Sequence, residues 1–265
     1  MNTQDKLLID REAGEGQALF EELRARHSTF FYRKSEAGIV SGRLELAWTF
    51  EVPGLGIFRP TMSLPLPQEP VPGRAPLSAD VRRLAFTIGL VELVSYWKIA
   101  CPPQVIVEAG PLDGEQAAWW KTLYFEGLGE FFYRNGIRTS LESFMDLSST
   151  VPAEERQTAE EQQQAASLGT PEPGQGVLIP VGGGKDSVVT LERLRPLGGA
   201  RWSFGINPTP ASLACMELAD IAEDRRLIVR RTLDPLMLEL NRQGYLNGHT
   251  PFSALVAFTA FSTAW

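Results

Sequence analysis

Cysteine and histidine are scarce in this sequence of 265 residues, which contains two of each. Cys101 and Cys215 form no Cys-x-x-Cys pair and provide no disulfide framework. A chain without such a framework is typical of a reducing compartment, so we expect a cytoplasmic protein. His27 stands before Ser28 and aromatic residues at the end of a predicted helix, and we expect it to be structural.

Long apolar runs, a secretion signal and an excess of positive charge are also missing. The most apolar segment, residues 84–100, contains Glu92 and Lys98 and falls short of the roughly 18 apolar residues of a membrane span. Residues 1–5 lack the basic and apolar pattern of a signal peptide. The net charge of −7 argues against nucleic acid, because binding to a phosphate backbone favours a basic surface. We therefore expect neither a membrane nor a nucleic-acid partner, and the oligomeric state stays open.

The sequence does contain a glycine-rich turn between a short apolar run and a helical pattern. The stretch reads Val177-Leu178-Ile179-Pro180-Val181-Gly182-Gly183-Gly184-Lys185-Asp186-Ser187. Three glycines let the backbone turn sharply and approach a ligand closely. The N–H groups of such a turn and of the helix after it form an anion site, to which Lys185 would add a positive charge. We expect Asp186 or Ser187 to cap the helix.

Two common phosphate-binding patterns do not fit this turn. The Walker pattern fails because Asp186 follows Lys185 and the earlier glycine is missing. The dinucleotide pattern G-x-G-x-x-G fails because Ser187 occupies its last position. The stretch instead resembles the PP-loop of the N-type ATP pyrophosphatases, Ser-Gly-Gly-x-Asp-Ser, with Gly182 in place of the first serine.

This resemblance implies an ATP site. It implies that residues 182–187 hold the pyrophosphate of ATP, that Asp186 binds Mg²⁺, and that ATP is cleaved to AMP and pyrophosphate. A glycine-rich turn between a strand and a helix, without a ligand, is the alternative interpretation.

Residues 148–176 divide the chain into two regions. They contain acidic pairs, a run of three glutamines and few large apolar residues, which indicates an exposed linker. The sequence thus predicts an N-terminal α+β domain over residues 1–147 and an ATP-binding domain over residues 177–265.

In the second region, predicted strands alternate with predicted helices: after the strand before the glycine turn, helices are expected at 187–194 and 210–223 and strands at 201–206 and 227–231. This order predicts an α/β fold with a doubly wound parallel sheet, which binds ligands beyond the carboxyl ends of its strands. The PP-loop resemblance implies that Ile206 and Asn207, where the second strand ends, contact adenine, and an ordinary strand end is the alternative. Because three strands are few and residues 255–265 are apolar with nothing after them to cover them, we expect this domain to be truncated.

In the first region, periodicity predicts helices and strands in a mixed order. The expected ranges are 15–27, 78–99 and 113–134 for helices and 30–34, 39–52, 56–64 and 105–108 for strands, with a turn at 36–38. Ser78 is the expected N-cap of the second helix. The third helix carries an aromatic stripe that includes Trp119 and Trp120; we expect core packing, with ligand stacking as the alternative.

A second polar segment lies near the end of the sequence. Asn247, Gly248, His249 and Thr250 precede Pro251, which suits the first turn of a helix. His249 is one of only two histidines, and its position favours a structural and a catalytic role about equally.

The two polar segments together resemble the UDP-N-acetylmuramoyl-L-alanyl-L-glutamate epimerases. The resemblance is carried by Val181–Thr190 and Gly244–Ala254, with weaker similarity at Glu92–Lys98 and Phe131–Ile137. It implies an isomerase of peptidoglycan precursor synthesis that uses ATP and Mg²⁺ to invert the terminal L-glutamate of UDP-MurNAc-L-Ala-L-Glu.

The family resemblance also implies roles for individual residues. Adenylation of the glutamate carboxylate makes the neighbouring Cα–H acidic enough for a side-chain base to remove. Asp186 and His249 are then the expected catalytic residues, and Asn247, Gly248 and Thr250 the expected contacts to the glutamyl group.

Two other functions stay open at this point. One is another PP-loop adenylating enzyme, either amide-forming or tRNA-modifying, although the acidic net charge and the absence of paired cysteines weigh against tRNA thiolation. The other is a nucleotide-binding module without catalysis. The nature of the product would separate these functions.

Overall fold

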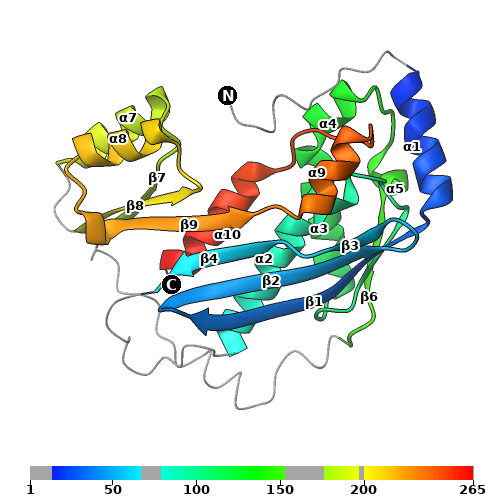
Figure 1. Ribbon diagram of the computed structural model, residues 1–265, viewed down its shortest axis with the longest axis horizontal. Coiled ribbons are helices and arrows are strands. Elements are labelled where there is room, and N and C mark those ends of the chain that lie inside the picture. The colour runs from blue at the N-terminus through cyan, green and yellow to red at the C-terminus, as the bar shows by residue number, and fades with distance from the viewer. Residues whose placement is uncertain (1–13, 67–78, 153–175, 197–199, 265) are drawn as a thin grey trace.

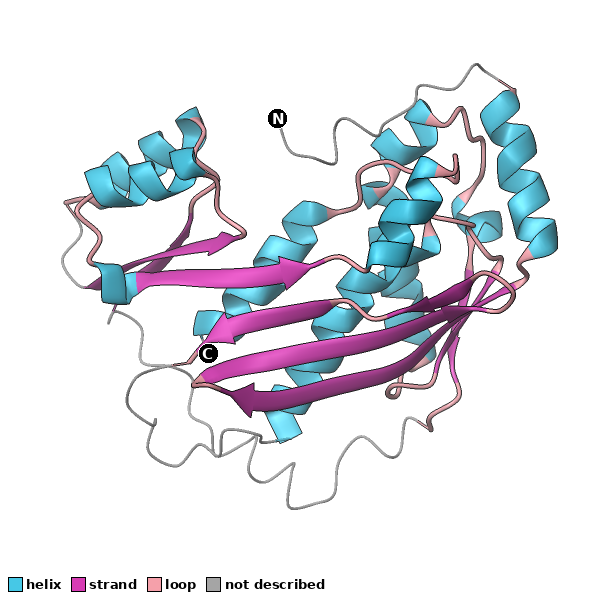
Figure 2. Ribbon diagram, in the orientation of Figure 1, coloured by secondary structure: helices cyan, strands magenta, loops and turns pink. Residues whose placement is uncertain are grey.

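The computed structural model describes residues 14–66, 79–152, 176–196 and 200–264. These residues form a mixed α/β fold around one nine-stranded sheet (Figures 1 and 2). The strands are β1 (Thr29–Val40), β2 (Arg43–Val52), β3 (Gly56–Phe58), β4 (Thr61–Pro65), β5 (Gln104–Val107), β6 (Asp146–Ser149), β7 (Gly176–Pro180), β8 (Ala200–Ile206) and β9 (Arg226–Thr232). The helices are α1 (Glu15–Arg26), α2 (Ala79–Trp97), α3 (Gly114–Gly127), α4 (Gly129–Arg134), α5 (Leu141–Phe144), α7 (Lys185–Leu194), α8 (Pro210–Leu218), α9 (Pro235–Arg242) and α10 (Phe252–Ala264).

The strand order is β6-β5-β1-β2-β4-β9-β8-β7, with β3 also paired to β2. The predicted parallel arrangement of β7, β8 and β9 is confirmed. These strands do not form a separate sheet, because β9 pairs antiparallel with β4 and places Arg231 opposite Met62. The linker between the two predicted domains falls mostly on residues 153–175, outside the described residues, so the domain division stays a prediction.

Several predicted boundaries change in the structure. Residues 36–38 lie inside β1, and the hairpin turn is formed by Ser41 and Gly42, with φ of 50° and 73°. Two left-handed residues in succession match the twist of a tight hairpin. The predicted strand 56–64 is divided into β3 and β4, and the predicted helix 210–223 ends at Leu218.

The helix predicted over residues 113–134 is two helices, α3 and α4, separated at Leu128. Asp113 caps α3 by accepting a hydrogen bond from the N–H of Gln116 at 2.8 Å. The break lies where Gly127 packs so closely on Pro251 that a side chain at position 127 would overlap the proline ring. The expected N-cap of α2, Ser78, lies outside the described residues.

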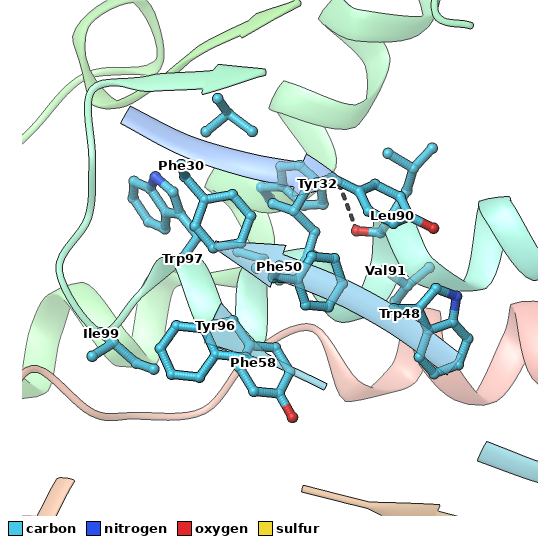
Figure 3. Packing of buried hydrophobic residues seen from close by; sticks show 14 of the residues in the cluster. Phe30, Tyr32, Trp48, Phe50, Phe58, Leu90, Val91, Tyr96, Trp97 and Ile99 are labelled. Atoms are coloured by element: carbon cyan, nitrogen blue, oxygen red, sulfur yellow. Dashed lines mark hydrogen bonds between the residues drawn. The ribbon is translucent and has the colours of Figure 1, made fainter. Parts of the chain in front are cut away.

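The main core is formed where α2 crosses the antiparallel strands. Large aromatic side chains fill it, among them Phe30, Tyr32, Trp48, Phe50, Phe58, Tyr96 and Trp97 (Figure 3). Their polar atoms are satisfied by backbone groups: the indole of Trp48 donates to the carbonyl of Ala85 at 2.9 Å, and the indole of Trp97 to that of Pro102 at 2.8 Å. Of the predicted stripe on α3 and α4, Trp120, Tyr124 and Phe131 are buried in this core. Trp119 is half exposed and stands edge-on to Trp120.

Helices cover both faces of the parallel strands. A smaller cluster, which includes Ile179, Leu191 and Met216, lies between these strands and helices α7 and α8. On the other face, α10 contacts α2, β7 and β8 (Figure 1). Leu255 and Thr259 are buried there, whereas Phe252 and Phe261 are exposed, so earlier elements cover only part of this apolar helix. No helix in the described part of the chain is long and apolar enough to cross a lipid bilayer.

Candidate functional site

The glycine turn lies at the carboxyl end of β7 and leads into α7. The helix begins at Lys185 with Gly184 as its N-cap, and no side chain caps it. The expected cap by Asp186 or Ser187 is therefore wrong, since both residues lie in the first helical turn. Gly183 has a φ of 84°, and a Cβ there would stand 2.6 Å from the backbone nitrogen of Ser212. Only glycine fits this position without strain.

Ser187 organises the turn from inside. Its Oγ accepts hydrogen bonds from the N–H groups of Gly182 at 3.0 Å and Gly183 at 3.3 Å. Two of the amides expected to face a ligand are thus satisfied internally. The N–H groups of Gly184, Lys185 and Asp186 donate to no acceptor among the described residues, and these three residues are exposed.

A second helix N-terminus adjoins this turn. Gly183 packs against the first turn of α8, where Thr209 is the N-cap and its Oγ1 accepts from the N–H of Ser212 at 3.1 Å. The positive ends of two helices therefore meet beside the carboxyl ends of β7 and β8. Together with the Lys185 side chain they make this edge of the sheet suitable for a phosphate group.

Asn207 connects β8 to β9. Its Nδ2 donates to the carbonyl of Arg231 at 2.7 Å, and its Oδ1 accepts from the N–H of Arg231 at 2.9 Å. The residue has a φ of 46°, a conformation that asparagine tolerates better than most residues. Ile206, the last residue of β8, is half-buried against the main core. The predicted contact of both residues with adenine stays a prediction.

The segment from Asn247 to Thr250 packs on helices of the first region. The carbonyl of Gly248 accepts from Nζ of Lys98, and a Cβ at Gly248 would stand 3.0 Å from the Cα of Phe131. The backbone carbonyl of Asn247 accepts from Nδ2 of Asn135 at 2.8 Å. The side-chain Oδ1 of Asn247 accepts from the N–H of Gly248 at 2.9 Å. Asn247 and Gly248 thus hold the backbone of the segment in place.

His249 is the exposed member of this segment. Its side chain is 58% exposed, and Nδ1 lies 3.6 Å from Oε1 of Glu130. The other carboxylate oxygen of Glu130 accepts from the backbone N–H of His249 at 2.8 Å. Thr250 turns inward instead, and its Oγ1 lies 3.3 Å from Oγ of Ser95. Glu130 can therefore orient the imidazole toward a ligand at the surface.

The two candidate segments lie apart in this structure. Figure 1 shows the glycine turn between β7 and α7, whereas residues 247–250 lie between α9 and α10 beside α4. In the described residues no group of three or more His, Cys, Asp and Glu side chains is arranged for a metal ion. An Mg²⁺ ion at Asp186 would depend on oxygens of a bound ligand and on water, which suits the way proteins hold this ion.

The structure reveals an ion pair that the sequence analysis missed. Glu92 on α2 has no exposed side-chain surface, and its two carboxylate oxygens accept from Nε and, at 2.7 Å, from Nη2 of Arg231. Burial by itself lowers the pKa of Arg231, but the charge and hydrogen bonds of Glu92 outweigh burial and the pKa is raised. The sequence does contain a signal for this pair: Glu92 lies in an apolar helix, and a buried carboxylate requires a partner of opposite charge.

Lys98, directly after the end of α2, is a second buried charge. Burial, together with the nearby charge of Arg231, lowers the pKa of its ammonium group to about 8, although Glu130 opposes this shift. The hydrogen bond from Lys98 to Gly248 thus joins a weakly basic amine to the segment that carries His249.

Comparison with known proteins places the chain in a family. The family model described as "MurL N-terminal domain" matches residues 21–265, and the chain belongs to this family. Curated relatives from Micromonospora sp., Xanthomonas oryzae pv. oryzae and Salinispora tropica are 33%, 36% and 32% identical over 92%, 63% and 78% of this chain. Each is named UDP-N-acetyl-alpha-D-muramoyl-L-alanyl-L-glutamate epimerase.

The chain spans about half the length of the Micromonospora relative, or 51%, and 33% and 41% of the other two. No solved structure matches the chain.

Proposed function

We propose that this chain acts in the ATP- and Mg²⁺-dependent inversion of the terminal L-glutamate of UDP-MurNAc-L-Ala-L-Glu. The observation that carries the proposal is the row of three exposed amides at Gly184, Lys185 and Asp186, which have no acceptor in the part of the chain that the structure describes and lie beside a second helix N-terminus. Membership of the MurL family and the names of the curated relatives support the choice of substrate.

The reaction requires activation of a carboxylate. In the first step a carboxylate oxygen of the glutamate forms a bond to the α-phosphorus of ATP, and the bond to pyrophosphate breaks. The resulting mixed anhydride no longer carries the negative charge that opposes loss of the Cα proton. A base then removes this proton, the proton returns on the opposite face, and water cleaves the anhydride to release AMP.

The glycine turn supplies electrostatic stabilisation for the first step. The amides of residues 184–186 and the Lys185 ammonium neutralise the phosphates of ATP and the departing pyrophosphate. Asp186 is exposed in the same helical turn and would hold Mg²⁺, which supplies further positive charge at these phosphates. Ser187 keeps the turn in shape through its bonds to Gly182 and Gly183.

We assign the second step, removal of the Cα proton, to His249. Glu130 restrains this residue through its backbone and lies beside its ring, as an orienting carboxylate does for a catalytic histidine. The carbon of the activated carboxylate is bonded directly to Cα, so adenylation and proton removal take place at neighbouring atoms. His249 can therefore act only in a state that brings residues 247–250 close to the glycine turn.

Replacement of Asp186 by asparagine tests the proposal. In the complete natural protein, supplied with ATP and UDP-MurNAc-L-Ala-L-Glu, we expect Asp186→Asn to lower pyrophosphate release by about 100-fold or more. Glu192→Gln is the matched control, because Glu192 is an exposed carboxylate on the same helix. Unchanged release in Asp186→Asn would remove Asp186 from the mechanism. ATP binding without pyrophosphate release in the parent protein would instead indicate a nucleotide-binding module.

A further inference from the structure

A continuous row of polar contacts runs from the end of β8 to the His249 segment. Both polar atoms of the Asn207 side chain bond the backbone of Arg231. The guanidinium of Arg231 bonds both carboxylate oxygens of Glu92, and its Nη2 lies 3.5 Å from Oγ of Ser95. Oγ of Ser95 in turn lies 3.3 Å from Oγ1 of Thr250.

Two members of this row, Glu92 and Ser95, lie on α2, and Lys98 follows directly after its last residue. These three residues are spaced at intervals of three, and the N–H of Lys98 still bonds the carbonyl of Val94, so they share one side. The first holds Arg231, the second touches both Arg231 and Thr250, and the third holds the carbonyl of Gly248. Helix α2 and the residue after it thus contact both the end of β9 and the segment that carries His249.

The buried ion pair between Glu92 and Arg231 fixes how α2 and β9 lie relative to each other. Side-chain exposure is 0% for Glu92 and 11% for Arg231, so water has little access to the pair. A buried charge that loses its partner is strongly destabilising, and a bidentate guanidinium–carboxylate pair also fixes orientation. A shift of β9 relative to α2 would therefore break the pair, so we expect β9 and α2 to move together, and Asn207 and Thr250 with them.

We propose that Arg231 and Glu92 are positioning residues, which couple the ligand-binding edge at β8 and β9 to the loop of residues 247–250. The catalytic consequence of the pair rests on the proposed function, whereas the mechanical coupling does not. Loss of a pair that only stabilised the whole fold would accelerate exchange wherever exchange requires global unfolding, without preference for these segments. A positioning pair governs two distant segments, residues 206–208 and 247–252, in particular.

Amide hydrogen exchange in the complete natural protein tests the coupling. We expect Glu92→Gln, which removes the charge and keeps the shape, to accelerate exchange in peptides covering 206–208 and 247–252 by about five-fold or more. Glu108→Gln removes a carboxylate from a half-buried pair with Arg33 and is the matched control. Acceleration in neither segment, in only one of them, or equally throughout the chain would overturn the proposal.

If the Glu92→Gln variant does not fold, Ser95→Ala provides a second test of the same coupling. It removes the hydroxyl between Arg231 and Thr250 and leaves the ion pair intact. We expect faster exchange in residues 247–252 and a fall of about five-fold in kcat for exchange of the glutamate α-hydrogen. The KM for ATP should change by less than about two-fold.

An unchanged kcat together with unchanged exchange in Ser95→Ala would overturn the relay through Thr250. A double-mutant cycle of Ser95→Ala with Thr250→Ala adds a second check, since the two effects on hydrogen exchange should be non-additive. If the parent protein neither releases pyrophosphate nor inverts glutamate, the proposed function fails. Hydrogen exchange then decides on the coupling alone.

Discussion

The hydroxyl of Ser187 accepts a hydrogen bond from the backbone N–H of Gly182 at 3.0 Å. This contact closes the glycine turn from within, and a second bond from Gly183 strengthens it. The serine therefore acts first on the shape of the loop, and the ligand-facing amides are those of the next three residues. The phosphate contact predicted for Ser187 would require its hydroxyl hydrogen to point outward while its lone pairs hold the turn.

We expect Ser187→Ala to weaken ATP binding about ten-fold, because the N–H groups of Gly182 and Gly183 lose the acceptor that holds the turn, and each hydrogen bond contributes about 0.5–1.5 kcal/mol. Isothermal titration calorimetry with ATP and Mg²⁺ measures the effect. Thr190→Ala is the control, since Thr190 lies on the same helix and its hydroxyl donates to the carbonyl of Asp186 within that helix. Equal affinities of the two variants would contradict the role of the turn.

Gly183→Ala should destabilise the protein, whereas Gly184→Ala should not. An alanine at position 183 meets both an unfavourable φ of 84° and the backbone of Ser212, and we expect a loss of at least about 2 kcal/mol. A Cβ at Gly184 meets no atom within 4 Å, and its φ of −92° suits any residue, so the loss should stay below about 1 kcal/mol. Urea unfolding of both variants provides the comparison.

His249→Ala should abolish exchange of the glutamate α-hydrogen with D₂O while pyrophosphate release continues. General-base catalysis contributes about 10²–10⁴-fold, so exchange should fall by at least about 100-fold. Glu130→Gln, which keeps the shape beside His249 but removes the charge, should lower exchange by a smaller factor. Proton NMR of the substrate follows both variants. Exchange at the parent rate in His249→Ala would exclude this histidine as the base.

Stability should depend on pH through Lys98. Its folded-state pKa of about 8 lies below the ordinary value of 10.5, so between these values the unfolded chain binds more protons than the folded chain. The free energy of unfolding from this group therefore rises as pH increases from about 8 to 10.5, by at most about 1.4 kcal/mol per unit. Below pH 8 the full cost of the buried charge is present.

Lys98→Met removes this dependence. The difference in unfolding free energy between Lys98→Met and the parent should shift in favour of the parent as pH rises from 8 to 9. Urea unfolding at both pH values measures this shift, and Lys34→Met, at an exposed position, is the control. A difference that does not change with pH would contradict the buried charge of Lys98.

Local signals in the sequence were sufficient for most elements. The helix expected over 15–27 is α1, and the strands expected at 105–108 and 201–206 are β5 and β8, because periodicity and breakers agree there. The hairpin turn was misplaced because Ser41-Gly42 lacks the usual asparagine or aspartate before glycine. Helix α9 was missed although Asp234 and Pro235 form a regular N-terminal signal, with the Asp234 carboxylate accepting from the N–H of Leu236.

The break between α3 and α4 had no such local signal. Gly127 and Gly129 are tolerated inside helices, and the interruption coincides with the approach of Pro251, more than 100 residues later in the chain. The pairing of β4 with β9 could not be predicted either, since the residues of a strand do not indicate which strand it pairs with.

The sequence by itself determined the glycine turn, the helix after it and the parallel strands that flank it, because backbone freedom and hydrophobic period act over a few residues. It also placed Asn247, His249 and Thr250 at the start of a helix. Only the tertiary structure decided that Ser187 closes the turn, that Arg231 pairs with Glu92, and that α2 holds both β9 and the His249 segment. The Ser187 contact is local, but the other contacts join residues up to 155 positions apart, and burial in a shared core selects them.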